Sequence, residues 1–275
     1  QMAHQATISP YPKEGVMGGV KIFRTVLFCL AGVVSLAAAG DLTITFRSET
    51  KVFRTKKSTE VHYYSEQYKC TNNESAKTDT LIDYKNSVLY QVNHKKKTIE
   101  KLTLDDALRI MEALAAQLEE SPEAKEKMGA IFGDANDEAK IEKVGSEVIL
   151  GRTCDKWKVS LGKNVTEISA DPSLAAPIPQ AALENTDKME GVKGMMAMIP
   201  GIGKLQEAAS KIKGVPLKTQ STISVGPMTV RGFSESTKIE EGPIPASRFE
   251  LPKGYKEKDL GKEMLEEINK KRKKK

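Results

Sequence analysis

Apolar and polar residues alternate with a period of two along residues 42–102. In the stretch "LTITFRS", Leu42, Ile44 and Phe46 alternate with polar side chains, which is the pattern of a strand with one buried face. The segment "TEVHYYSEQYKC" follows, and then the polar turns "YKNS" and "HKKK" separate short apolar runs. We therefore expect consecutive antiparallel strands, the shortest of them at 81–83, 88–93 and 98–102.

After Thr103 the apolar residues recur at intervals of three and four. This period predicts an amphipathic helix, with Thr103 as its N-cap and with Asp105 and Asp106 at the positive end of its dipole. Two more helices are predicted, at 122–133 and after Leu260. The apolar positions of the first helix are Leu104, Leu108, Met111, Leu114, Ala115 and Leu118.

A second block of strand patterns covers residues 139–171 and 215–241. Trp157, Val159 and Leu161 share one face by their period of two, and Cys154 lies on the opposite face. Turn signals stand at 145–146 and 162–164, whereas Gly151 indicates a bend or bulge within a strand. The order strands, helix, strands, helix, strands, with short connections, predicts an α+β fold with antiparallel pairing.

The N-terminal residues have the composition of an export signal. Lys21 and Arg24 precede an apolar run, and 37–39 are alanines suited to a signal peptidase. The run is shorter than the roughly 20 residues of a transmembrane helix. We predict a non-native upstream extension at 1–16, a cleaved signal peptide at 17–39, one domain at 40–258, and a charged helix with a basic tail at 259–275. The expected location is periplasmic or secreted, and the cleaved chain is not an integral membrane protein.

The formal net charge of +6 is concentrated at one end of the chain. The last six residues, "KKRKKK", carry six positive charges, which equals the whole excess. Because the rest is balanced, we expect no basic face and no nucleic-acid partner. The tail either contacts an anionic envelope surface or is a solvated terminus.

Cysteine and histidine are too sparse to indicate catalysis or metal binding. Cys70 and Cys154 remain after signal cleavage; in an oxidising compartment they form a disulfide or stay separate buried thiols, and both interpretations stay open. No CxxC motif occurs, and the three histidines form no cluster, so we expect no metal and no cofactor. The sequence offers neither a phosphate-binding glycine loop nor a base beside a thiol, and we expect no enzymatic activity.

A methionine-rich segment and several aromatic residues are the candidates for ligand binding. Residues 178–213 have a broken helical pattern in which Pro200 and four glycines interrupt the methionines. Methionine is common on surfaces that accept varied apolar ligands, but it also fills gaps in cores. The aromatic residues line a pocket or are half-buried strand residues. The predicted pocket lining is Tyr63, Tyr90 and Trp157, and the predicted movable cover is Met195, Met196, Met198 and Ile199.

Five motifs occur in an order that resembles a bacterial envelope family, the domain of unknown function DUF4412. They are "LIDYKNSVLYQVNHKKKTIEKL", "GRTCDKWKV", "TEISAD", "GVPLKTQ" and "FELPKGYK", and they span about residues 41–256. The chain departs from the family pattern where Trp157 replaces the usual tyrosine and where Ile168 replaces an aromatic residue.

This resemblance implies a fold similar to that of the lipoprotein carrier and receptor proteins LolA and LolB. That fold is a strongly curved antiparallel sheet forming an unclosed half-barrel, with helices covering its concave face. The resemblance supplies no catalytic residues. Cys154 occupies the family's cysteine position, which favours a structural role for it.

Two hypotheses for function follow. In the first, an exported non-enzymatic protein binds or carries an apolar ligand, such as a lipid or acyl chain, in the cell envelope, because a half-barrel leaves an apolar surface that helices or a ligand must fill. In the second, the protein is a structural or protein-interaction module of the envelope whose half-barrel is filled by its own helices.

Overall fold

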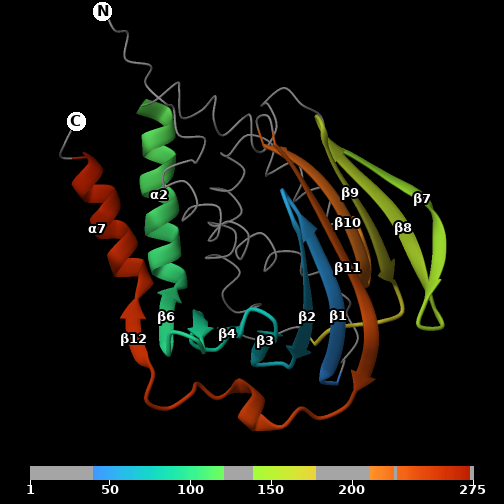
Figure 1. Ribbon diagram of the computed structural model, residues 1–275, viewed down its shortest axis with the longest axis horizontal. Coiled ribbons are helices and arrows are strands. Elements are labelled where there is room, and N and C mark those ends of the chain that lie inside the picture. The colour runs from blue at the N-terminus through green and yellow to red at the C-terminus, as the bar shows by residue number, and fades with distance from the viewer. Residues whose placement is uncertain (1–39, 121–138, 178–210, 226–227, 273–275) are drawn as a thin grey trace, which may run out of the picture. The chain divides into compact units, whose positions relative to one another are not determined.

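The computed structural model describes residues 40–120, 139–177, 211–225 and 228–272 (Figure 1). Among them, 12 strands form one sheet. The elements in chain order are β1 (Leu42–Lys51), β2 (Thr55–Tyr64), β3 (Tyr68–Asn73), β4 (Thr78–Asp83), β5 (Val88–Asn93), β6 (Thr98–Thr103), α2 (Leu104–Glu120), β7 (Ala139–Ile149), β8 (Arg152–Leu161), β9 (Asn164–Asp171), β10 (Val215–Val225), β11 (Met228–Glu241), the 3-10 helix η1 (Ala246–Phe249), β12 (Lys256–Asp259) and α7 (Leu260–Arg272).

The sheet is antiparallel except at one edge. Its strand order is β12-β6-β5-β4-β3-β2-β1-β11-β10-β9-β8-β7, and only β12 and β6 run parallel. The edges β12 and β7 are not paired with each other, so the sheet is unclosed. Helices α2 and α7 lie side by side and both pack against β6 (Figure 1). The predicted fold class, α+β with a curved, unclosed antiparallel sheet and packed helices, is confirmed.

Three successive hairpin turns share one local chemistry. Asn73, Asp83 and Asn93 each end a strand, and a side-chain oxygen of each accepts a hydrogen bond from the backbone N–H three residues later, at 2.8, 2.9 and 2.9 Å. The last residue of each turn has a positive φ: 55° at Lys77, 53° at Ser87 and 50° at Lys97. Because Asn and Asp stabilise such turns through their own side chains, the meander from β3 to β6 is encoded locally.

Helix α2 begins at the predicted N-cap. The backbone N–H of Asp106 donates to Thr103 Oγ1 at 3.1 Å, and the Thr103 hydroxyl donates to the Asp106 carboxylate at 2.6 Å. Helix α7 begins after Asp259, whose carboxylate accepts a hydrogen bond from the N–H of Lys262 at 2.9 Å. Both starts follow the usual rule that a side-chain oxygen satisfies an otherwise unpaired N–H of the first turn.

Two glycines have roles that differ from the predicted ones. The turn predicted at 145–146 is wrong, because β7 continues through it with a bulge between Lys143 and Gly145, where φ is 147°. The chain instead reverses at Leu150 and Gly151, whose φ values are 51° and 77°. A bulge and a tight turn favour the same residue type, so glycine alone does not distinguish them.

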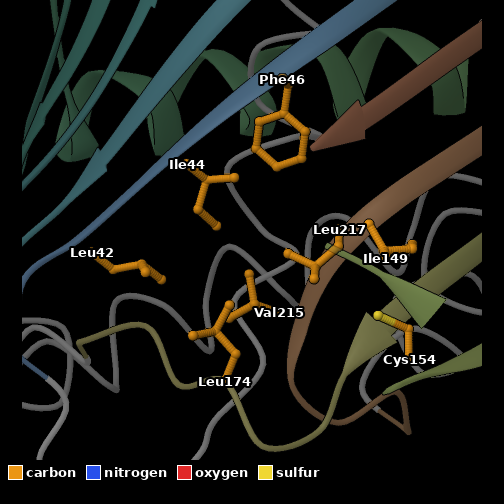
Figure 2. Close-up of a cluster of buried hydrophobic side chains, with 8 residues drawn as sticks. All are labelled: Leu42, Ile44, Phe46, Ile149, Cys154, Leu174, Val215 and Leu217. Carbon is orange, nitrogen blue, oxygen red and sulfur yellow. The ribbon is translucent and has the colours of Figure 1, made fainter. Parts of the chain in front are cut away.

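The main buried cluster joins strands from the middle and one end of the sheet (Figure 2). It contains Leu42, Ile44, Phe46, Ile149, Cys154, Leu174, Val215 and Leu217. A smaller cluster forms around Val159, Ala170 and Ile212, and Trp157 packs against it. Cys154 therefore packs in the same cluster as Phe46, whereas Trp157 packs against the second cluster.

Candidate functional site

Strand pairing divides the side chains of β1 and its neighbours between two faces. On β1 and β2, Ile44 stands opposite His62 and Phe46 opposite Glu60. We call the side that these residues share the Phe46 face; it carries Leu42, Ile44, Phe46, Glu60, His62 and Tyr64. The other side is the Tyr63 face, where one row across four strands contains Tyr63, Cys70, Leu81 and Tyr90.

His62 is a buried polar side chain in the middle of the Phe46 face. It is 6% exposed, and its ring lies 4.8 Å from the ring of Phe46. Its Nδ1 is 3.2 Å from the Tyr64 hydroxyl and its Nε2 is 3.5 Å from a Glu60 carboxylate oxygen. Burial lowers the pKa of His62 despite the hydrogen bond to Glu60, which acts in the opposite direction. The imidazole is therefore neutral at pH 7, which suits an apolar surface with a few polar groups.

The Phe46 face extends across the sheet to Trp157. Successive strand partners form one row, in which each residue stands opposite the next on the neighbouring strand. Ser48, at the β1 end of this row, is two positions from Phe46 and so shares its face. The row is Trp157, Ile168, Thr219, Ser234 and Ser48.

Two buried polar atoms on this face have no hydrogen-bond partner among the described residues. They are the indole Nε1 of Trp157 and the hydroxyl oxygen of Ser236. Ser236 stands opposite Phe46 in the register of β1 and β11, so both atoms belong to the Phe46 face. A buried donor without a partner costs about 1–3 kcal/mol, so a bound molecule with hydrogen-bond acceptors would stabilise this surface.

The Tyr63 face is covered by the chain's own C-terminal segment. Residues 243–255, which we call the strap, connect β11 to β12 (Figure 1). Phe249 stacks on Tyr68 with ring centroids 5.1 Å apart, and the guanidinium of Arg248 lies 5.5 Å from the ring centre of Tyr63. Burial raises the pKa of Tyr63 although Arg248 opposes this change. Most of the closing family motif, "FELPKGYK", thus lies in the strap.

A hydrogen-bonded chain fastens the end of the strap. The Tyr255 hydroxyl lies 3.1 Å from His94 Nδ1, and His94 Nε2 lies 2.8 Å from a carboxylate oxygen of Asp79. The other oxygen of Asp79 accepts a hydrogen bond from the Asn72 amide at 2.7 Å. Because each member of this chain has a partner, we interpret the arrangement as a fastening of the strap rather than an open site.

The structure does not bring the three predicted aromatic residues together. Tyr63 and Tyr90 share the Tyr63 face, whereas Trp157 lies on the Phe46 face, so a pocket lined by all three is corrected to two separate surfaces. The sequence analysis did not identify His62 as a candidate site residue. In the structure its ring lies against the ring of Phe46. The predicted cover, Met195, Met196, Met198 and Ile199, lies outside the described residues, and so do the segments 1–16 and 17–39.

Cys70 and Cys154 are free, buried thiols, and the disulfide interpretation is corrected accordingly. Five strands separate β3 from β8 in the sheet order. Strands are spaced about 4.8 Å apart, whereas a disulfide needs Cα atoms within about 7 Å. Burial raises the pKa of Cys70 to about 12 and that of Cys154 to about 11. Such thiols are poor nucleophiles at neutral pH.

An ionic network lies next to Cys154 in the "GRTC" motif. Arg152 forms ion pairs with Asp171, at 3.1 Å, and with Glu241. Asp171 is 1% exposed and accepts hydrogen bonds from the N–H and hydroxyl of Ser173. Burial opposes the ionisation of Asp171, but the hydrogen bonds from Ser173 and Arg152 outweigh it and lower the pKa. This network fixes the end of β9 to β8 and β11, and we assign it a structural role.

Within the described ranges, no group of three or more His, Cys, Asp or Glu side chains is arranged to hold a metal ion. No helix in the described part of the chain combines the length and hydropathy that a membrane span requires.

Comparison with protein families shows that the chain belongs to one of them. The sequence model of the domain of unknown function DUF4412 matches residues 37–255. No curated protein matches the sequence.

Solved structures share parts of the fold at low sequence identity. An uncharacterised conserved protein from Thermus thermophilus has a TM-score of 0.41 at 8% identity, over 88% of this chain and 99% of that one. The LolA superfamily protein NE2245 from Nitrosomonas europaea has a TM-score of 0.32 at 6% identity, over 83% and 97%. PNGF-II has a TM-score of 0.38 at 15% identity; 84% of this chain is covered, and it spans only 33% of PNGF-II. At TM-scores below 0.5, these structures assign no function to the chain.

Proposed function

Because the chain belongs to the DUF4412 family, which assigns it no activity, we propose a function from the geometry. The protein is exported to the cell envelope, where it binds or carries an apolar ligand, such as a lipid or acyl chain, on the Phe46 face. The export signal predicted at 17–39 supports the location. The apolar residues of β1 bind the chain of the ligand, and the polar groups around them bind its oxygen atoms.

The observation that carries this proposal is the pair of buried polar atoms on the Phe46 face that have no partner among the described residues. Trp157 Nε1 is only a donor, and the Ser236 hydroxyl donates or accepts. An ester or carboxylate oxygen accepts from either group, while the alkyl chain covers neighbouring apolar side chains. Ligand sites commonly combine a mainly apolar lining with few polar groups in this way.

Binding is favoured over catalysis by the state of the potential nucleophiles. Cys70 and Cys154 are buried, and burial raises the pKa of each thiol. His62 contacts Tyr64, Glu60 and the ring of Phe46, an arrangement that offers a polar anchor but no base–nucleophile pair.

A second candidate function is an envelope interaction module. The edge strand β7 and the turn after it expose Val144, Val148 and Leu150. An exposed strand edge with apolar residues accepts an additional strand from a partner. In this alternative the helices of the chain itself fill the half-barrel, and the protein takes up no acyl ligand.

The experiment exploits the single tryptophan of the chain. Trp157 is the only indole and lies on the proposed binding face, so a fatty acid brominated along its alkyl chain would quench its fluorescence on binding. We expect saturable quenching, and competition by the unbrominated fatty acid. Native mass spectrometry of protein purified from its own host, with solvent extraction in parallel, would then identify the natural ligand class. A bare protein mass together with unquenched Trp157 would contradict the carrier proposal and favour the interaction module.

A further inference from the structure

The hairpin between β1 and β2 ends in two exposed apolar residues. Phe53 is 84% exposed and Val52 is 40% exposed. Both lie between the strands, where Lys51 and Thr55 form the last pair of the β1–β2 ladder. Exposing a phenylalanine ring to this extent gives up the free energy of its burial. A ring at the tip of a hairpin is also placed to contact something outside the molecule.

Cations surround these two residues. We call Lys51–Lys57 the hairpin tip; all seven residues are exposed, and four of them are basic: Lys51, Arg54, Lys56 and Lys57. No acidic residue occurs between Glu49 and Glu60. Lys57 lies 3.4 Å from a carboxylate oxygen of Glu49, and such an exposed pair is weak. The hairpin tip therefore combines an apolar centre with a positively charged rim.

The hairpin tip extends past the neighbouring strand. β3 pairs with β2 only between Glu60 and Tyr64, so its ladder stops before the tip. On the other side, Arg231 of β11 stands opposite Lys51 and adds a fifth basic residue at this end. A strand rises about 3.3 Å per residue, so Phe53 lies well beyond the last pair with β3 and is free to meet a flat surface.

We propose that the hairpin tip docks the protein onto a lipid bilayer that carries anionic headgroups. Phe53 and Val52 enter the interfacial layer of the bilayer, and the basic residues around them bind lipid phosphates. Apolar insertion combined with electrostatic attraction is the physical basis of reversible membrane binding. A soluble polyanion would pair with the cations but would leave Val52 and Phe53 in water, and for this reason the bilayer fits better. The inference does not depend on the acyl-ligand proposal, because the tip lies at a strand end.

The buried thiols make a direct test possible. The protein used is residues 40–275, which contain every described element. In it, Cys70 and Cys154 are buried and have raised pKa values. A cysteine introduced at the hairpin tip is therefore the thiol that reacts with a labelling reagent. Phe53→Cys is labelled with the environment-sensitive dye NBD and mixed with vesicles of phosphatidylcholine, with or without phosphatidylglycerol. We expect a blue-shifted, brighter emission only with phosphatidylglycerol, and quenching by lipids with a spin label in the bilayer. Val148→Cys, at another exposed apolar position (69%), is the matched control and should show neither effect.

Vesicle flotation of unlabelled variants gives an independent measurement. Phe53→Ser should lower the partition coefficient about tenfold or more, and Lys56→Gln should lower it about fivefold, whereas Val148→Ser should leave it unchanged. Binding should weaken as salt is raised. Equal flotation of Phe53→Ser and the wild type would overturn the proposal. Loss of binding only on removal of Lys270–Lys275 would assign membrane contact to the basic tail instead.

Discussion

The two faces of the same strands differ in whether their polar groups find partners within the chain. On the Tyr63 face, the strap supplies a partner for each polar group of its fastening, from Tyr255 through His94 to Asp79. On the Phe46 face, Ser236, opposite Phe46 of β1, and Trp157, on β8, each have a buried polar atom without a partner among the described residues. Polar groups that already have partners within the chain have little left to offer a ligand. We infer that the family's closing motif serves the fold, and the proposed ligand site lies on the opposite face.

The largest expected effect comes from truncating the centre of the Phe46 face. Ile44 is fully buried in the main cluster, so Ile44→Ala should lower the free energy of unfolding by about 3 kcal/mol. Thr43→Ala, one position along on the other face, should change it by less than about 0.5 kcal/mol. Urea denaturation measures both. Equal losses for the two variants would mean that the faces are not as different as the structure indicates.

A smaller effect is expected from unfastening the strap. Tyr255→Phe removes the hydrogen bond to His94 and should cost about 1 kcal/mol, with faster hydrogen exchange in residues 243–255. Quenching of Trp157 by brominated fatty acid should be unchanged, because the strap covers the other face. Tyr90→Phe is the control, since its hydroxyl has no hydrogen bond among the described residues. A Tyr255→Phe variant with impaired ligand uptake would contradict the separation of the two faces.

Two neighbouring serines of β11 test whether the Phe46 face has an unsatisfied hydroxyl. Ser234 Oγ lies 3.0 Å from Ser48 Oγ, whereas the Ser236 hydroxyl has no partner among the described residues. In ligand-free protein, Ser234→Ala should lower stability by about 0.5–1 kcal/mol, and Ser236→Ala should leave it unchanged or raise it slightly. With ligand bound, Ser236→Ala should lose affinity. Thermal unfolding with and without fatty acid separates the two results.

The smallest effect is a pH dependence from His62. Burial lowers the pKa of this residue below its ordinary value of 6.5, so the unfolded chain binds a proton before the folded one as the pH falls. The contribution of neutral His62 to the free energy of unfolding is therefore complete above pH 6.5, and it is lost as the pH falls below that value. Lowering the pH from about 8 to about 5 should therefore reduce the free energy of unfolding of the wild type more than that of His62→Leu. A constant difference over this range would show that His62 titrates normally.

Local signals account for much of the fold. The strand patterns around Ile44, the side-chain oxygens of Asn73, Asp83 and Asn93, and the cap at Thr103 act within a few residues, and the corresponding elements are present. The exchange of roles between Gly145 and Gly151 shows the limit of this logic. Whether a glycine makes a bulge or a turn depends on the register with β8, which lies further along the chain.

The candidate site was harder to predict, because it depends on which strands become neighbours. Period two places Trp157 and Tyr63 correctly within their own strands, but only the pairing from β8 to β2 shows that they occupy opposite faces. The same order separates Cys70 from Cys154 by five strands. His62 carries no distinctive motif, and its burial beside Phe46 follows from cross-strand contact.

The sequence by itself determined the alternation of faces, the hairpin turns, the helix starts and the family, because these depend on residues close together in the chain or on their order. The tertiary structure decided which face the strap covers, which polar atoms of the described residues remain without partners, and that a basic, aromatic hairpin tip extends past its neighbour. These features arise from contacts between residues far apart in sequence, and a pattern along one strand contains no information about the strand that will lie beside it.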